Sequence, residues 1–381
     1  MAKIFHTGDL HLDSAFACLR MTESDKAREN QRLNFSAMMK YAADSGADII
    51  LISGDMFDSR YITKATEELV IKTFSSLTCP VVISPGNHDP YAHCTIYSSG
   101  KLPPNVYVFN SEEMQMFEFN MKSDNSKACV FGYAFLDDRL DTCPVIGYTP
   151  EIPAEENEST LSILCAHADI TSHTSKYACA TAADIAHGGF DYAALGHIHN
   201  PPEPIKIGKT LISYCGFPLG RSFDELGYGG AMWITTDGKK ISAERIIFAS
   251  HRYITENLDI SGTRDTEEIS EKIKNLISTR GYAEETFLRV ILCGTVSEDC
   301  VIDPDNLSAV CGNIGMLDIR DETLPMPDEN FLEHDITLRG ELYRTLLPKI
   351  QSGTPEERKT SAEALRIGLA VMDGRNTSGL L

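Results

Sequence analysis

The sequence predicts an α/β fold with a large layered core, in which β-sheets are flanked by helices, followed by a smaller α/β unit and a short helical C-terminal segment. Short apolar runs alternate with helix-forming stretches through the first half of the chain. The pattern changes near Ser250, and at 381 residues the chain is long enough for two domains. We therefore expect a core at 1–250, a second unit at 251–335 and a helical segment at 336–381.

The core is predicted from strands that are apolar at successive positions, as expected where both faces of a sheet are buried. Helix formers fill the stretches 23–44 and 64–77, and the second places its apolar side chains on one face. The predicted strands are Ile4–Phe5, Ile49–Ile52, Val81–Ile83, Leu161–Leu164 and Tyr192–Leu195.

The later part of the chain has its own pattern. Residues 264–280 carry apolar side chains at helical spacing, and the runs 253–260 and 287–293 on either side are typical of strands. Two helical stretches follow residue 336. The second begins with Thr354-Pro355-Glu356-Glu357, a capping box with proline at the first helical position.

Composition indicates a reduced, cytoplasmic globular protein that does not enter a membrane. Hydrophobic residues make up 42% of the chain and charged residues 23%, which is ordinary for soluble proteins. The apolar runs are too short to span a bilayer, and the N-terminus has no apolar segment typical of a signal peptide. The 11 cysteines include no C-x-x-C pair, which disfavours a zinc ribbon or a compact disulfide framework.

Each predicted strand of the core is followed by Asp, Asn or His. In open α/β sheets, sites form outside the carboxyl ends of the strands, so these polar segments are expected to converge on one rim. The segments are Gly-Asp-Leu-His at 8–11, Ser-Gly-Asp-Met-Phe-Asp at 53–58, Ser-Pro-Gly-Asn-His-Asp at 84–89, Cys-Ala-His-Ala-Asp at 165–169 and Gly-His-Ile-His at 196–199.

The residue types at this rim predict a metal centre. Neutral imidazoles, carboxylates and an amide oxygen, without a thiolate, suit Mn²⁺, Fe²⁺ or Zn²⁺. The set exceeds what one tetrahedral ion needs and is sufficient for two ions with a bridging carboxylate, the arrangement that hydrolyses phosphate esters. The seven candidate ligands are Asp9, His11, Asp55, Asn87, His167, His197 and His199.

The five motifs in this order resemble the signature of the calcineurin-like metallophosphoesterases, over roughly residues 3–235. The resemblance implies that Asp9, His11 and His199 hold one ion and that Asn87, His167 and His197 hold the other, with Asp55 bridging them. It further implies that His88 is not a ligand, and that it protonates the leaving oxygen or stabilises the transition state. Asp58 would orient His88.

Within that superfamily the sequence is similar to the SbcD-type DNA double-strand-break repair exonucleases, in particular their YhaO-like branch. The similarity lies in residues 5–14, 54–58 and 213–225. It implies a metallophosphoesterase core with a capping domain at 251–335, Mn²⁺ as the ion, dimers, and an SbcC-like coiled-coil ATPase as partner. The expected function is hydrolysis of DNA phosphodiesters, by an exonuclease or endonuclease.

Other functions use the same chemistry. Phosphoprotein phosphatases are disfavoured, because the chain has Gly-Asn-His-Asp and because Ser59 separates Asp58 from Arg60. A cyclic-nucleotide or other small-molecule phosphodiesterase or phosphatase stays open. A non-catalytic DNA-end-binding scaffold predicts eroded ligands, and all seven are present. The net charge of −21 repels polyanions, so we expect the lone chain to bind DNA weakly.

Several polar and apolar residues near these motifs have competing interpretations. His6 is expected to be structural, and Asp169 either orients a histidine or lies in a solvated loop. Arg221, Phe223 and Glu225 form either a substrate wall or a plain turn. Leu365, Leu369 and Met372 are expected to pack within the chain, with a partner surface as the alternative. The histidines outside the motifs, expected at the surface or at helix ends, are His93, His173, His187, His251 and His334.

Overall fold

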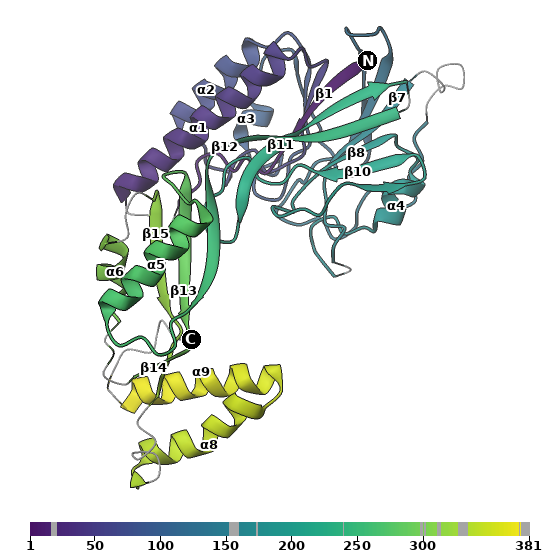
Figure 1. Cartoon of the computed structure of the whole chain (residues 1–381). Helices are drawn as coiled ribbons and strands as arrows, with labels where there is room; N and C mark the ends of the chain where they lie inside the picture. Colours follow the sequence, from purple (N-terminus) through teal and green to yellow (C-terminus); the bar gives the residue numbers. More distant parts are fainter. Residues whose placement is uncertain are drawn as a thin grey trace. The chain divides into compact units, whose positions relative to one another are not determined.

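The computed structural model describes residues 1–16, 21–151, 160–172, 174–238, 240–297, 300, 302–310, 314–326, 334–372 and 374. The chain forms two compact units, Met1–Tyr253 and Ile254–Leu381 (Figure 1). None of the helices in the described ranges has the length and apolar character needed to cross a membrane.

The first unit contains two β-sheets. In the first sheet the neighbouring strands are, in order, β12 (Lys240–Asp259), β11 (Gly227–Asp237), β1 (Ala2–Thr7), β2 (Ile49–Ile52), β3 (Val81–Ile83) and β4 (Val106–Val108). In the second sheet they are β5 (Gln115–Asn120), β6 (Lys127–Gly132), β7 (Thr160–His167), β8 (Tyr192–Gly196), β10 (Thr210–Tyr214) and β9 (Ile205–Ile207). The strands that lead into the predicted ligands run parallel within each sheet, β1 to β3 in one and β7 to β8 in the other.

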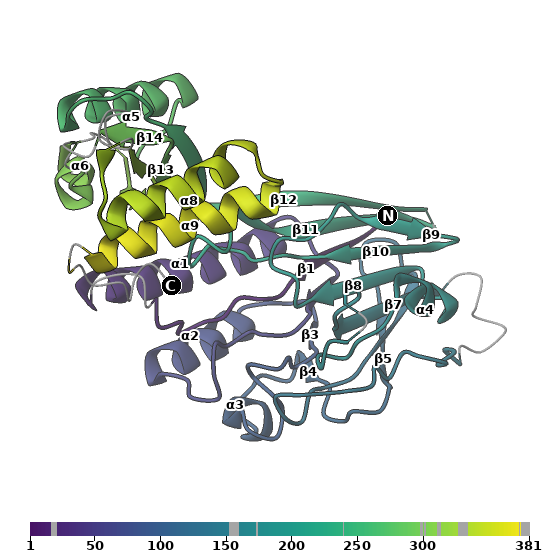
Figure 2. The ribbon, with the colours of Figure 1, turned by 90° about the horizontal axis from the view of Figure 1, so that it is seen from below.

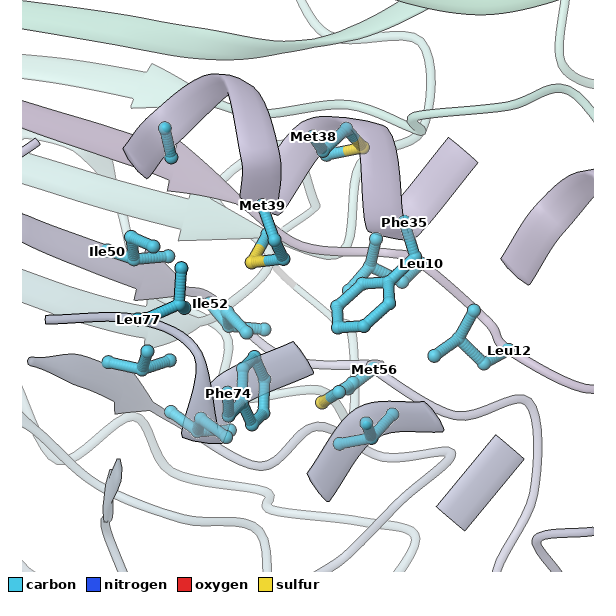
Figure 3. Close-up of a cluster of buried hydrophobic side chains, with 14 of the residues drawn as sticks. Leu10, Leu12, Phe35, Met38, Met39, Ile50, Ile52, Met56, Phe74 and Leu77 are labelled. Atoms are coloured by element: carbon cyan, nitrogen blue, oxygen red, sulfur yellow. The ribbon is translucent and has the colours of Figure 1, made fainter. Parts of the chain in front are cut away.

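Both faces of the first sheet are buried, and this explains why its strands are apolar at successive positions. Ile49 and Leu51 of β2 face the core between the two sheets, while Ile50 and Ile52 face the core under the helices. In that second core they meet Phe35, Met38 and Met39 of α1 (Met21–Asp44) and Phe74 of α2 (Lys64–Ser75), as Figure 3 shows.

The segments after β1 and β2 alternate between this core and the predicted site. Leu10 and Leu12 are buried in the core cluster. Asp9 and His11, which alternate with them along the chain, carry the polar side chains of the predicted site. Met56 anchors the 53–58 segment in the same way (Figure 3). Packing of these apolar side chains therefore fixes the backbone from which the polar side chains project.

Short helices complete the first unit. They are α3 (Thr95–Ser98) and α4 (Ala182–His187). Ile185 of α4 packs on the outer face of the second sheet. Thr181 and Asp184 form a capping box at the start of α4, and the Thr63 side chain accepts a hydrogen bond from Thr66 N at the start of α2.

The second unit has its own apolar core. The end of β12 continues into it and neighbours β13 (Thr286–Cys293), which pairs in parallel with β15 (Met316–Asp321). Buried side chains alternate along β13 and pack against Ile269 and Ile273 of α5 (Thr266–Arg280). The remaining elements of this unit are β14 (Thr295–Ser297), α6 (Pro304–Val310), β16 (Leu324–Met326), α8 (Leu338–Ser352) and α9 (Pro355–Met372).

Helices α8 and α9 lie side by side in Figures 1 and 2. Leu365 and Leu369 are buried with Tyr343 in a small cluster between them, so these two residues pack within the chain as expected. Met372 is 39% exposed and is not a member of that cluster.

The sequence left two features of the sheets undetermined. The predicted ligands follow strands of both sheets, since β1, β2 and β3 belong to one sheet and β7 and β8 to the other. Residues 253–259 are a strand as expected, but they are the end of β12, which is continuous from Lys240 to Asp259. Apolar runs identify buried strands, but they carry no information on which strands share a sheet.

Candidate metal centre

The loops after β1 and β2 are joined by backbone hydrogen bonds, which bring their polar side chains together. Asp9 N donates to Gly54 O at 3.0 Å and His11 N donates to Asp55 O at 2.9 Å. The loop after β3 joins them, because His88 N donates to Asp55 Oδ1 at 3.0 Å. The end of β8 is attached by His197 N, which donates to both Asp9 carboxylate oxygens at 3.0 Å.

Four of the predicted ligands have left-handed backbone conformations. The φ angles of Asp9, His11, Asp55 and His197 are 47°, 44°, 47° and 103°. Such angles are uncommon outside glycine and cost free energy, so the surrounding hydrogen bonds must hold them. They turn each side chain sharply out of its strand toward the common centre.

Glycines allow the segments to approach this closely. Gly54 has φ +93°, and a Cβ there would fall on the His167 ring. A Cβ at Gly196 would overlap Ser53 O. The glycines that precede polar residues in the motifs therefore leave the space that the imidazole and the crossing backbone occupy.

Asp9, His11 and His199 form the first group of ligand atoms, which we call the His11 cluster. Nε2 of His11 lies 3.1 Å from Nε2 of His199. The other ring nitrogens face carboxylates: His11 Nδ1 lies 3.2 Å from Asp58 Oδ1 and His199 Nδ1 lies 2.9 Å from Glu225 Oε1. A carboxylate beside each Nδ1 favours the tautomer with the hydrogen on Nδ1, in which the two Nε2 lone pairs face each other, as a shared cation requires.

Asp55, Asn87 and His167 form the second group, which we call the His167 cluster. His167 Nδ1 lies 3.0 Å from the backbone oxygen of Ser53, so it donates there and leaves the Nε2 lone pair facing inward. That Nε2 lies 3.0 Å from Asn87 Oδ1 and 3.4 Å from Asp55 Oδ2. Three acceptor atoms converge with no donor between them, and this arrangement also fits a cation.

The carboxylate of Asp55 lies between the two clusters. Its Oδ2 is 3.4 Å from His167 Nε2 and 3.7 Å from His11 Nε2. Asp9 also approaches the His167 cluster, with Oδ1 3.9 Å from His167 Nδ1. One buried carboxylate is therefore within reach of both groups of ligand atoms.

His197 reaches the centre chiefly through its backbone. Its ring centroid lies 5.1 Å from that of His167 and 4.9 Å from that of Tyr177, and its Nε2 lies 3.9 Å from Asp169 Oδ2. Among the described residues, no group of three or more His, Cys or carboxylate ligand atoms within 4.8 Å of one another includes His197. Its assignment to an ion remains a prediction.

His88 and Asp58 contact each other differently from the expectation. The His88 ring packs edge-on against His11, with centroids 4.8 Å apart, and His88 Nδ1 donates to the backbone oxygen of Asp58 at 3.1 Å. The Asp58 carboxylate faces His11 and Arg221 instead. The contact that orients His88 is made by the Asp58 main chain, and the side chain orients His11.

Residues 222–225 form a turn closed by the hydrogen bond from Glu225 N to Ser222 O, and Arg221 and Glu225 also brace the metal centre. Glu225 Oε1 accepts from His199 Nδ1 and from Arg221, while Arg221 Nη1 donates to Asp58 Oδ1 at 2.9 Å. The chain of contacts His199–Glu225–Arg221–Asp58–His11 thus braces both histidines of the His11 cluster. Phe223 is buried and packs edge-on against Tyr253 at 5.0 Å.

Two further residues that position the site were missed from the sequence. Asp89, the last residue of Gly-Asn-His-Asp, accepts from Gly86 N, Met56 N and Tyr97 Oη at 2.6–2.8 Å, and so fastens two ligand loops together. Its position at the end of the Gly-Asn-His-Asp motif is the feature of the sequence that could have identified Asp89. Gln31 of α1 donates to Leu10 O and His11 O at 3.0 and 2.8 Å, and nothing local in the sequence marks it.

Burial favours the uncharged form of His11, His167 and His197, the form in which an imidazole binds metal. It lowers the pKa of His11 and of His167, and burial together with His167 lowers the pKa of His197 to about 4. Burial is the largest influence on His199 and would lower its pKa, but the hydrogen bond to Glu225 and the charges of Asp9 and Glu225 together raise it. Burial alone would raise the pKa of Asp55, yet the neighbouring histidines hold it below its usual range.

The structure also distinguishes between the interpretations of His6 and Asp169. His6 is buried, with its ring nitrogens 2.8 Å from Tyr192 Oη and 3.0 Å from Ser53 Oγ, so it is structural. Asp169 accepts from Thr171 N at 2.8 Å and faces His197, which favours an orienting role.

The histidines outside the motifs divide as follows. His93 lies 3.5 Å from Asp137 on a partly exposed surface, and His187 is the exposed last residue of α4. The surface assignment of His251 is wrong, because its ring is buried and Nε2 lies 3.0 Å from Gly220 O. His334 is exposed, and His173 lies outside the described residues.

Comparison with known proteins identifies relatives of this chain. Over 307 residues it is 24% identical to the uncharacterized metallophosphoesterase YhaO of Bacillus subtilis strain 168, an alignment covering 77% of this chain and 72% of the relative. Two solved structures also match, each with 13% identity and a TM-score of 0.39. They are TT1561 of Thermus thermophilus (64% of this chain, 98% of that one) and GAP50, the anchor in the inner membrane complex of Plasmodium (65% and 84%).

The model of one protein family, the calcineurin-like phosphoesterases, matches residues 2–201. The matched stretch spans all seven predicted ligands, from Asp9 to His199, and it covers more than half of the chain. Its two sheets flanked by helices, with polar groups gathered at the strand ends, agree with that fold. The chain belongs to the calcineurin-like phosphoesterase family.

Proposed function

We propose that this chain hydrolyses phosphodiester bonds with two divalent ions, that Mn²⁺ is its metal, and that DNA is its substrate. The family normally binds two divalent metals. The observation that carries the two-ion proposal is the Asp55 carboxylate, whose Oδ2 lies within 3.7 Å of a ligand nitrogen in each cluster. A ligand shared by two ions holds them close together, as two-ion hydrolysis of phosphate esters needs.

The proposed ligand sets follow the clusters. Asp9, His11 and His199 would hold one ion. Asn87, His167 and His197 would hold the other, and Asp55 would serve both. When bound, the ions would lower the pKa of a water and neutralise phosphoryl charge. The proposed roles of Asp58, Glu225 and the Ser53 carbonyl are to hold each imidazole with its Nε2 lone pair directed inward.

His88 is the proposed acid. It is exposed at the rim and edge-on to His11, while its Nδ1 hydrogen is held by the Asp58 carbonyl at 3.1 Å. A proton on Nε2 would then face outward, toward the oxygen that leaves when the phosphorus–oxygen bond breaks. The ring donates no ligand nitrogen in this scheme.

DNA as the substrate is supported by sequence similarity to the SbcD-type nucleases, in residues 5–14, 54–58 and 213–225. The same similarity supports a capping role for residues 251–335, a dimer, and an SbcC-like ATPase partner. An acidic chain gains from such a partner, because phosphate contacts supply much of the affinity for DNA.

A small phosphodiester is the second candidate, and the pairing of basic side chains favours it. Arg28 and Arg32 of α1 pair with Asp25 and Asp13, at 2.5 and 3.6 Å, and are therefore partly neutralised. The net charge of −21 disfavours a long polyanion at the surface of the lone chain. Such a substrate needs only the metal pair.

The test compares Mn²⁺-dependent hydrolysis of linear duplex DNA, single-stranded DNA and a chromogenic phosphodiester by the full chain. We expect the chromogenic diester to be cleaved, the activity to be lost on chelation and restored by Mn²⁺, and DNA to be cleaved slowly without a partner. Hydrolysis of phosphomonoesters alone would contradict the proposal. Cleavage of the chromogenic diester but of no DNA, with or without the ATPase, would favour the second candidate.

The affinity of the lone chain for DNA tests the partner separately. With catalysis blocked by His88→Ala, fluorescence anisotropy should give a Kd in the non-specific range, about 10⁻⁴–10⁻⁶ M, that weakens steeply with salt. Tight binding of DNA ends by the lone chain at physiological salt would contradict the need for a partner.

A further inference from the structure

A pocket opens beside the His11 cluster in the first unit. Its volume is about 220 Å³. One wall is His199, a predicted metal ligand, and the other lining residues are Asn200, Pro201, Phe217, Leu226, Tyr228 and Arg245. A group bound there would lie next to a phosphate held at the metal centre.

The apolar wall of the pocket is unusually exposed. Leu226, which directly precedes β11, is 47% exposed, and Tyr228, near the start of β11, is 36% exposed. The Arg252 guanidinium lies 4.9 Å from the Tyr228 ring centroid, and the two residues are directly paired across β11 and β12. This cation–π contact orients the Tyr228 ring beside the pocket.

The pocket also contains a positive charge. Arg245 Nη1 donates to Cys215 O at 2.6 Å and Nη2 lies 3.5 Å from Tyr214 O. Within the part of the chain that the structure describes, its guanidinium pairs with no carboxylate, in contrast to Arg221, which pairs with Glu225 and Asp58. In a chain of net charge −21, an arginine held by carbonyls alone leaves its charge available for an anion.

We propose that this pocket is a subsite for the nucleoside next to the scissile phosphate. Leu226 and Tyr228 contact the base or sugar, and Arg245 contacts the next phosphate. The volume of about 220 Å³ lies below the roughly 300–1,000 Å³ of pockets that enclose drug-sized ligands, so it suits one ring system rather than a duplex. This inference rests on the proposed phosphodiesterase function and names the group that the site selects.

The test uses two phosphodiesters that release the same p-nitrophenolate. One is the p-nitrophenyl ester of thymidine 5′-monophosphate and the other is ethyl p-nitrophenyl phosphate, so only the retained group differs. The full chain with Mn²⁺ should prefer the thymidine ester in kcat/KM. Tyr228→Ala should reduce that preference about tenfold through KM, as expected for lost base–aromatic contact, and should leave the ethyl ester unaffected.

Matched variants separate the contributions. Tyr228→Phe keeps the ring and should keep the preference, and Ile247→Ala, an exposed apolar residue of β12 outside the pocket lining, should change nothing. A thymidine ester that also carries a 3′-phosphate should be favoured further by the wild type. Arg245→Gln should remove that additional preference, again about tenfold, because the charged hydrogen bond to the second phosphate is lost.

Inhibition experiments distinguish a free nucleotide from a nucleic-acid strand as the occupant of the subsite. Thymidine monophosphate and a short oligothymidylate should both inhibit hydrolysis of the thymidine ester, and tighter inhibition by the oligonucleotide would identify a nucleic-acid strand as the occupant. Inhibition by neither would overturn the subsite. So would equal use of the two esters by the wild type, or a preference that survives Tyr228→Ala. Failure to hydrolyse either ester with Mn²⁺ would overturn the proposed function itself, and the subsite with it.

Discussion

The two ligand clusters hold their histidines by different means. In the His11 cluster both imidazoles are braced by side chains, through Asp58 and Glu225, which Arg221 joins. In the His167 cluster the imidazole is braced by a backbone oxygen, that of Ser53, and by the space left at Gly54. The orientation of the imidazoles in the His11 cluster can therefore be altered by replacing one charged side chain. The orientation of the imidazole in the His167 cluster depends on the course of the backbone.

Loss of the Asp55 carboxylate should have the largest effect, because it removes the proposed bridge between the two ions. Asp55→Asn should abolish tight binding of both ions and slow phosphodiester hydrolysis by more than about 10³-fold, since several kcal/mol of charge stabilisation would be lost. Elemental analysis and kcat measure this, with exposed Asp44→Asn as control. Two ions retained per chain would refute the bridging role.

His88→Ala should separate chemistry from metal binding in both clusters. Hydrolysis should slow by about 10²–10⁴-fold, the usual contribution of a positioned acid, while the metal content stays that of the wild type. His93→Ala, at a partly exposed histidine away from the centre, is the control and should be neutral. If the metal were lost together with activity, His88 would be a ligand.

A change at Gly54 should weaken the His167 cluster more than the His11 cluster. In Gly54→Ala the new Cβ falls on the His167 ring, so the imidazole must leave the Ser53 carbonyl. We expect metal affinity at that cluster to fall by about 100-fold, the upper end for changes around a ligand, with one ion still bound tightly. Calorimetric titration with Mn²⁺ resolves the two sites.

The control for this variant is Gly100→Ala, whose glycine is also left-handed, with φ +71°, but has open space around it. It should show only the backbone penalty, about 1–2 kcal/mol in the free energy of unfolding, and normal metal binding. Equal weakening of both clusters in Gly54→Ala would mean that they are not independently held.

Glu225→Gln should give the smallest effect, confined to the His11 cluster. The amide can still accept from His199 Nδ1, but it loses the charge that pairs with Arg221. Metal affinity at this cluster should fall by about tenfold, the lower end for such partners. The exposed neighbour Asp224→Asn is the control. An unchanged affinity would show that orientation alone, and not charge, is what Glu225 provides.

The sequence by itself determined which residues are available as metal ligands and where the strands that precede them end. Continuous apolar runs predicted the strands of the core, because a strand that is buried on both faces needs apolar residues at successive positions. Asp9, His11, Asp55 and His167 could be named because glycine and polar residues at the end of an apolar run are local features. The same holds for α2 and α5, where the predicted and observed helices agree to within two residues at each end.

Only the tertiary structure decided which groups meet. The apolar runs did not reveal that β7 and β8 belong to a second sheet, because pairing depends on contacts between distant segments. Arg221 reaches Asp58 across 163 residues, and Gln31 of α1 holds the backbone of the His11 loop from 20 residues away in the sequence. Such contacts arise from how the layers pack. Local sequence predicts which segments form strands and helices, but only the packing of distant segments decides which side chains come into contact.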